Sequence, residues 1–274
     1  MISSRTGSVA RHGLSYGTTV LFLLPIYVLV NLAIRPVDDV SPAYLPTSRA
    51  TTGNFVTAWT QSSLGSAMVT SIIVTTLSCL AILVFSTMAA YPLARSTAGL
   101  STATFYFFLI GLLLPFQVAL LPLYLTMRDL HLLGTVWSLV LCYAGVQMPF
   151  SIFLVATFLR SSVATEFEEA ARIDGCGDVQ AFVHVVVPLL RPVLGTLVIL
   201  NGVGIWNDFF TPLLYLAGSN RNTLPVAIYQ FVGLYSTSWA LIFAALIISM
   251  IPILVIFLAF QRYVIRGFAG GLKG

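Results

Sequence analysis

Residues 166–188 read EFEEAARIDGCGDVQAFVHVVVP, and this stretch is the most acidic part of the sequence. It holds five of the nine acidic residues, namely Glu166, Glu168, Glu169, Asp174 and Asp178. Thr165 followed three residues later by Glu168 is a capping-box pattern, which predicts that a helix begins here. Gly175 is expected to end this helix in a left-handed conformation. Asp178 is then expected to cap a second short helix that runs as far as Pro188.

The first of these two helices is short and carries little bulk. It spans about nine residues, or roughly 13 Å, which is less than a bilayer crossing requires. Isolated helices of fewer than about 12–15 residues are marginal in water, so another surface must hold this one in place. Two interpretations stay open from the residues alone. The helix either lies in a solvated interfacial loop, or its small Ala170 and Ala171 let it dock closely into a cleft of a partner.

The composition around this stretch is that of a membrane protein. Of the 274 residues, 58% are hydrophobic and 8% are charged, whereas soluble domains carry roughly 25% charged residues. The formal net charge is +4, but the basic residues sit at the edges of apolar segments and do not form a patch. Nucleic-acid binding is therefore not expected. Neither the cysteines nor the histidines have metal-ligand spacing, so no metal site is expected.

Six apolar segments are long enough to cross a bilayer, which needs roughly 20 helical residues. The sequence therefore predicts an all-α integral membrane protein with one six-helix domain over residues 14–262. The expected spans are 14–34, 66–91, 103–124, 135–158, 187–214 and 239–261. Residues 1–13, the loop 160–186 and residues 263–274 are expected outside the membrane. The first segment exceeds the apolar core of a signal peptide, about 7–15 residues, and is expected to be retained.

Basic residues predict the orientation of these spans, because cytoplasmic segments carry an excess of arginine and lysine. With both termini cytoplasmic, nine basic residues lie inside: Arg5, Arg11, Arg95, Arg160, Arg172, Arg191, Arg262, Arg266 and Lys273. Four lie outside: Arg35, Arg49, Arg128 and Arg221. This count favours a multi-pass protein of the cell membrane with cytoplasmic termini and a cytoplasmic acidic loop.

The acidic loop resembles the EAA signature of ABC-importer permeases, E-A-A-x3-G-x9-I-x-L-P. The match consists of residues 169–171, Gly175, Val185, Val187 and Pro188, with valine in place of isoleucine and leucine. The segments EEAARIDG, PLLRP and WNDFFTPL are similar to the carbohydrate-uptake branch of that family. The ending QRYVIRGFAGGLKG is similar to the tail of its smaller, maltose-type permease. AAYPLAR departs at Pro92 from the usual A-Y-A-x-A-R.

The resemblance implies a permease subunit of a sugar importer for a di- or oligosaccharide or an amino sugar. Such a subunit forms the translocation path with a second homologous permease, within membrane lipid. Two ATPase subunits bind ATP and Mg²⁺, and an extracytoplasmic sugar-binding protein delivers the substrate. The sequence contains no P-loop pattern, so neither a cofactor nor enzymatic activity is expected in this chain.

Two groups of site residues follow from the resemblance. The ATPase-coupling residues would be Glu168, Glu169, Ala170, Ala171, Asp174 and Gly175. A tail that contacts the ATPase would consist of Gly270, Gly271, Leu272, Lys273 and Gly274, although a frayed terminus is the alternative. The external loop at about 217–238 would correspond to the loop that enters the binding protein.

Polar residues within the apolar segments are candidates for the translocation path. They are Gln117, Gln147, Asn201, Trp206, Asn207 and Asp208. A carboxylate in a span is costly and usually faces a cavity or a partner. Asp208 and its neighbours therefore either bind sugar or hold helices together near an outer gate. The competing functions are a self-sufficient secondary transporter or channel, for which Asp208 would be the ion site, and an intramembrane enzyme, for which no nucleophile and base can be named.

Overall fold

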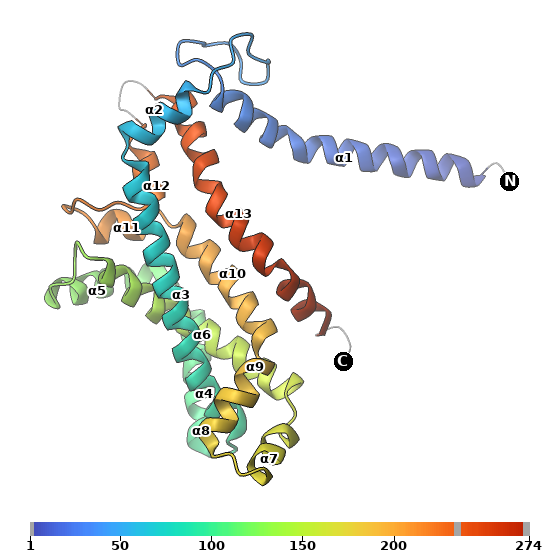
Figure 1. Ribbon diagram of the computed structural model, residues 1–274, viewed down its shortest axis with the longest axis vertical. Coiled ribbons are helices and arrows are strands. Elements are labelled where there is room, and N and C mark those ends of the chain that lie inside the picture. The colour runs from blue at the N-terminus through green and yellow to red at the C-terminus, as the bar shows by residue number, and fades with distance from the viewer. Residues whose placement is uncertain (1–2, 233–236, 271–274) are drawn as a thin grey trace. The chain divides into compact units, whose positions relative to one another are not determined.

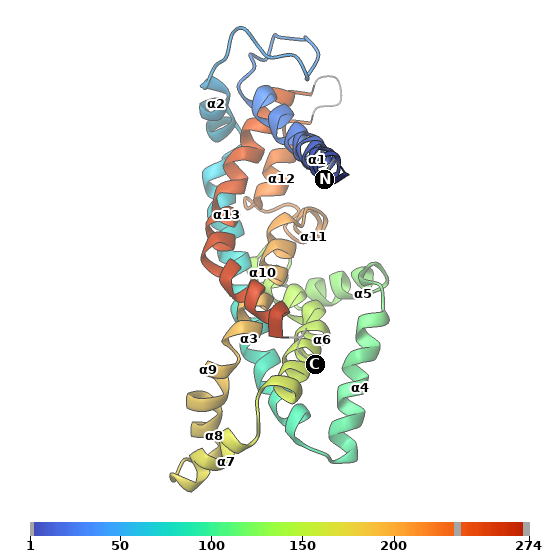
Figure 2. The same ribbon diagram turned by 90° about the vertical axis from the view of Figure 1, so that its right-hand side faces the viewer.

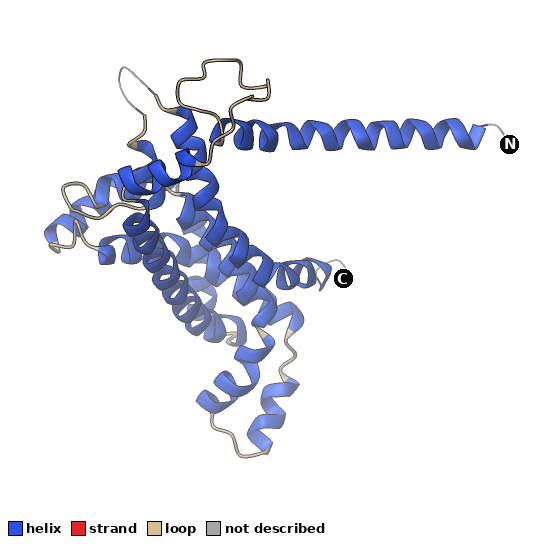
Figure 3. Ribbon diagram, turned by 45° about the horizontal axis from the view of Figure 1, so that its top comes forward, coloured by secondary structure: helices blue, strands red, loops and turns tan. Residues whose placement is uncertain are grey.

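The computed structural model describes the backbone of residues 3–232 and 237–270, and it is built from helices, with a long loop between α1 and α2 (Figures 1 and 3). The helices in chain order are α1 (Ser3–Ala33), α2 (Gly53–Gln61), α3 (Leu64–Arg95), α4 (Gly99–Leu113), α5 (Phe116–Asp129), α6 (Val136–Ser162), α7 (Glu166–Ile173), α8 (Asp178–Ala181), the π-helix η1 (Phe182–Val186), α9 (Val187–Leu189), α10 (Arg191–Asn207), α11 (Phe210–Tyr215), α12 (Leu224–Tyr229) and α13 (Trp239–Gly270).

Two compact units make up the chain. One combines Met1–Gly65 with Val226–Ile251, and the other combines Ser66–Pro225 with Pro252–Gly274. Within the described residues, four helices are long and apolar enough to cross a membrane, and two bent helix pairs raise the number to six if each pair is one span. These helices confirm the expected fold class, an all-α membrane protein.

In the first unit, three polar side chains organise the loop that follows α1. Asn31 donates its amide to the carbonyls of Ala43 and Leu45, both at 2.8 Å. The Arg35 guanidinium, 2% exposed, donates to several carbonyls of the same loop, including that of Leu45 at 2.6 Å. Asn54 of α2 closes the base of the loop through the carbonyls of residues 33 and 35. These hydrogen bonds fix the conformation of the loop. Arg35 therefore has a structural role in addition to its place in the charge pattern that predicts topology.

The expected third span is two helices instead of one. Helices α4 and α5 meet at 102° around Leu114 and Pro115. Proline forces its preceding residue away from helical dihedrals, and Leu114 is accordingly extended, with φ −81° and ψ 120°. Pro115 also lacks an N–H to continue the hydrogen-bond ladder. Pro115 is the sequence feature that causes this bend, whereas hydropathy does not depend on helix direction and indicates only an apolar segment.

A second bend interrupts the expected fifth span. The segments Asp178–Leu189 and Arg191–Asn207 meet at 68° on either side of Leu190. Pro188 and Pro192 flank this residue, and neither can donate a backbone hydrogen bond. The chain breaks again at Asp208, which is extended, before α11 begins. The expected span over 187–214 therefore contains two breaks, at Leu190 and at Asp208, and its crossing of the membrane stays a prediction.

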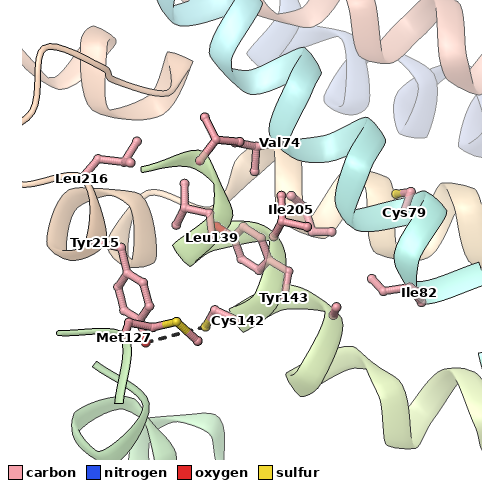
Figure 4. Close-up of a cluster of buried hydrophobic side chains, with 13 residues drawn as sticks. Val74, Cys79, Ile82, Met127, Leu139, Cys142, Tyr143, Ile205, Tyr215 and Leu216 are labelled. Atoms are coloured by element: carbon pink, nitrogen blue, oxygen red, sulfur yellow. Dashed lines mark hydrogen bonds between the residues drawn. The ribbon is translucent and has the colours of Figure 1, made fainter. Parts of the chain in front are cut away.

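The core of the second unit consists of two apolar clusters, and α6 runs through both. In the first cluster, residues of α3, α5, α6, α10 and α11 surround the fully buried Leu139 and Tyr215 (Figure 4). In the second, α3, α4, η1 and α10 enclose Ile152 and Leu159 of α6, both 0% exposed. Helix α6 is therefore packed into the core of this unit from Val136 to Leu159.

Candidate functional site

Residues 166–188 form α7, α8, η1 and the first part of α9, and α7 and α8 lie near the ends of α3 and α4 at one end of the second unit (Figures 1 and 2). Helix α7 has eight residues, and all three glutamates lie in its first turn. Thr165 precedes it but makes no side-chain capping bond and has helical dihedrals, φ −65° and ψ −25°. The helix therefore begins where the capping-box pattern predicted, but the capping box itself does not form. Glu168 cannot reach back to Thr165 because it is engaged elsewhere.

Glu168 points into the protein and binds α3. Its Oε2 atom accepts a hydrogen bond of 2.7 Å from the Tyr91 hydroxyl, and its Oε1 atom accepts one of 2.8 Å from Nε of Arg95. Nη2 of Arg95 lies 2.6 Å from the same Oε1. Glu168 is only 4% exposed. A buried carboxylate is tolerated when its charge is paired and its oxygens are hydrogen-bonded, and this site meets both conditions.

Arg95 also binds the end of α6. Its guanidinium donates to the carbonyls of Val163, at 2.8 Å, and Leu159, at 3.4 Å. Arg160 of α6 returns the contact by donating to the carbonyl of Leu93 at 2.8 Å. The last carbonyls of a helix lack partners within it and carry partial negative charge. Each of the two helices therefore satisfies the other's C-terminus with an arginine.

Gly175 ends the helical region of α7 as the sequence predicted. Its φ is +87°, which is left-handed, and the N–H of Cys176 bonds to the carbonyl of Ala171 at 2.9 Å. The predicted cap of α8 is wrong, however, because Gly177 occupies the N-cap position and Asp178 is the first helical residue. The Asp178 carboxylate instead pairs with Arg172 across the turn, at 3.0 Å.

The α7–α8 module, defined as residues 166–186 so that it includes η1, has a surface that is apolar in part. Its large exposed apolar residues are Phe167, Ile173, Val179 and Val183, at 53%, 86%, 76% and 48% exposure. Of the six predicted coupling residues, Glu168 and Ala171 are buried, whereas Glu169, Ala170, Asp174 and Gly175 are exposed. The module therefore exposes both carboxylates and large apolar side chains.

Most of the predicted ATPase-contacting tail lies outside the described residues. Gly270 is the last residue of α13. Gly271, Leu272, Lys273 and Gly274 lie outside the described residues, so their role stays a prediction.

The candidate path residues do not form one group. Asp208 joins α10 to α6, because its Oδ2 atom accepts a 2.9 Å hydrogen bond from Tyr143. Its Oδ1 atom accepts from the N–H groups of Phe210 and Thr211, at 3.0 and 3.4 Å, and so caps α11. Both carboxylate oxygens are thus engaged in holding the break between α10 and α11.

The other candidates differ in their surroundings. Asn201 is 3% exposed and donates to Ser151 of α6 at 3.3 Å, giving a second polar link between α10 and α6. Trp206 is 4% exposed. Asn207 is exposed and bonds within α10, Gln117 is exposed on α5, and Gln147 is half-buried on α6.

Tyr91 and Arg95 were not identified from the sequence as site residues. A usable signal was present, since residues four apart lie on the same face of a helix. A tyrosine and an arginine on one face at the end of an apolar span indicate a buried anion, and the acidic loop supplies one. Tyr143 carried no comparable signal, because one tyrosine in an apolar segment is ordinary.

The sequence of this chain matches a known protein family. Residues 82–270 match the model of the binding-protein-dependent transport system inner membrane component. The melibiose/raffinose/stachyose import permease protein MelC of Bacillus subtilis (strain 168) is 34% identical over 252 residues, covering 92% of this chain and 91% of that protein.

Two crystal structures share the fold. A bacterial ABC transporter involved in the import of the acidic polysaccharide alginate matches with a TM-score of 0.83 at 21% identity, over 96% of this chain and 98% of that chain. A bacterial alginate ABC transporter in complex with alginate pentasaccharide-bound periplasmic protein matches with a TM-score of 0.61 at 16% identity, over 93% and 95% of the two chains.

The fold is therefore that of an ABC-importer permease. The chain belongs to the family of binding-protein-dependent transport system inner membrane components. Within it, the protein is a permease of sugar importers, as its resemblance to the carbohydrate-uptake branch indicated. Permeases of this kind are not enzymes, and ATP hydrolysis belongs to a separate subunit.

Proposed function

We propose that this permease forms a sugar-translocation path with a second homologous permease, and that α7 and α8 couple it to two cytoplasmic ATPase subunits. Those subunits would bind ATP and Mg²⁺, and an extracytoplasmic binding protein would deliver a di- or oligosaccharide or an amino sugar. Both termini and the α7–α8 module would face the cytoplasm, in agreement with the excess of basic residues on that side.

The observation that carries the coupling proposal is the exposed apolar surface of the module. Ile173 of α7 is 86% exposed and Val179 of α8 is 76% exposed, and α7 lies outside the helices that could cross a membrane. Large aliphatic side chains gain free energy when they leave water, about 25 cal/mol for each Å² buried. The exposed Glu169 and Asp174 beside them suit basic or amide groups of a partner. A groove with apolar walls and a basic rim would therefore accept this module.

Replacement of Ile173 by aspartate tests the docking. The side chain is almost fully exposed, so the substitution should change the stability of this subunit by no more than about 0.5 kcal/mol. In a docked groove it would bury an unpaired charge, which is far more costly. We expect Ile173→Asp to abolish copurification of the ATPase while the permease still inserts into the membrane.

The matched control is Leu100→Asp, which makes the same change at a residue that is 80% exposed in the first turn of α4. This variant should retain the ATPase. Undiminished ATPase recovery with Ile173→Asp would refute the docking surface.

The alternative of a self-sufficient secondary transporter receives less support from the geometry. Its ion site would be Asp208, but both oxygens of that carboxylate are already engaged by Tyr143 and by the start of α11. A carboxylate that serves as a helix cap and a helix link is a structural group in this conformation.

A further inference from the structure

We propose that Glu168 is a positioning residue, and that the cluster of Tyr91, Glu168 and Arg95 transmits movement of α7 to α3 and α6. The cluster is named the latch below. This inference rests on the coupling function proposed above, but it assigns a different task to Glu168 from that of its neighbours. It also gives Tyr91 and Arg95 a role in transport.

The first argument is the direction of the two adjacent glutamates. Glu169 is exposed and available to a partner, whereas Glu168 is 4% exposed and bound inside the subunit. Successive residues on a helix point about 100° apart, so a pair of glutamates places one carboxylate outward and the other inward. One can receive a displacement from outside while the other passes it on.

The second argument is the convergence of bonds on Arg95. Its guanidinium contacts Glu168 of α7 and the carbonyls of Leu159 and Val163 at the end of α6, and the residue itself belongs to α3. One planar group therefore connects three helices. Five rigid N–H donors in a fixed fork allow little rotation once several are engaged, so displacement of the carboxylate must displace α3 and α6 or break the bonds.

The third argument is the stiffness of the surroundings. The side chains of Arg95 and Glu168 are 17% and 5% exposed, so the pair is shielded from water. Charge-assisted hydrogen bonds are about twice as strong as neutral ones. Beyond the latch, α6 enters the second apolar cluster through Leu159 and the first through Leu139. A shift at α7 is thus conveyed to a packed helix and is not absorbed by a flexible loop.

The test uses the complete importer purified with its ATPase subunits and trapped with ATP and orthovanadate. Amide hydrogen exchange is measured, with and without trapping, in α7 and at the ends of α3 and α6, residues 88–95 and 155–162. The variants are Glu168→Gln, which removes the charge but keeps the shape, and Tyr91→Phe, which removes one hydrogen bond. Glu166→Gln is the matched control, because this exposed glutamate lies in the same helical turn.

We expect trapping to change exchange in all three segments of the wild-type protein and of Glu166→Gln. In Glu168→Gln the change should persist in α7 but fall by at least about fivefold at the ends of α3 and α6, as for loss of an ordinary coupling energy. Tyr91→Phe should give a smaller reduction. A purely structural role would instead raise exchange equally in both states.

An unchanged trapping response at α3 and α6 in Glu168→Gln would overturn the latch. If Glu168→Gln does not assemble, a wild-type response of Tyr91→Phe would overturn it equally. Absence of any trapping response in wild-type α7 would instead contradict the proposed ATPase coupling, so the two failures are distinguishable.

Discussion

Replacement of Asp208 by alanine tests whether this carboxylate holds the helix break or binds the sugar. The substitution removes the hydrogen bond from Tyr143, at 2.9 Å, and the cap that Oδ1 provides to the N–H groups of Phe210 and Thr211. Asp208→Asn is the companion variant, because asparagine also caps helices well.

The structure allows the magnitude to be worked out. Loss of a helix N-cap costs about 1 kcal/mol, and a hydrogen bond to a charged group contributes about 1.5–3 kcal/mol. Interhelical bonds in membranes average only about 0.6 kcal/mol, which lowers the second figure. We therefore expect Asp208→Ala to cost about 2–3 kcal/mol, and Asp208→Asn about 1 kcal/mol because the cap is retained.

The assay is thermal unfolding of the purified importer, combined with sugar uptake. With about 2–4 °C lost for each kcal/mol in a domain of this size, Asp208→Ala should lower the midpoint by about 5–10 °C. Asp129→Asn, a change at an exposed carboxylate that pairs with Arg128, should have little effect. In a double-mutant cycle, Tyr143→Phe and Asp208→Asn should be non-additive.

A full loss of uptake with an unchanged midpoint in both Asp208 variants would refute this reasoning. That result would make Asp208 a substrate ligand. Strictly additive effects of Tyr143→Phe and Asp208→Asn would equally contradict the interhelical link.

Two further changes have defined expected outcomes. Gly175 has a φ of +87° and open space where a Cβ would lie. Gly175→Ala should therefore destabilise this helix end by about 1–2 kcal/mol through backbone strain alone, whereas Gly175→Asn should be better tolerated. Amide hydrogen exchange across residues 166–176 measures the difference between the two variants. Hydrogen bonds from the Ser41 hydroxyl and N–H hold the pKa of Asp39 below its usual value. Since the folded pKa is depressed, its stabilisation of the loop at 36–50 is complete above the unfolded pKa and is lost as the pH falls through the folded value, so acid should accelerate proteolysis of this loop in the wild type more than in Asp39→Asn.

The fold class and the family could be predicted from the sequence because they depend on local properties. Apolar length indicates a span, and the spacing from Glu169 to Pro188 indicates the loop. Gly175 was also predictable, since a left-handed helix end needs little information from the rest of the chain.

The bends and the latch depend on properties that a hydropathy pattern does not contain. Pro115 lies at a bend of 102° within a segment that hydropathy indicates as one span. The hydrogen bond between Arg95 and Glu168 joins residues 73 positions apart. The sequence already explained each residue locally, Arg95 by the charge pattern of the membrane topology and Glu168 by the capping box. A residue with a sufficient local role gives no sign that it has a distant partner.

ATP-driven sugar uptake into proteoliposomes tests the central claim most directly. One preparation holds the importer assembled with its ATPase subunits and binding protein, and the other holds this chain alone under an ion gradient. We predict uptake of the sugar carried by the copurifying binding protein only in the first preparation and only with ATP and Mg²⁺. Uptake by this chain alone, driven by the ion gradient, would contradict the account.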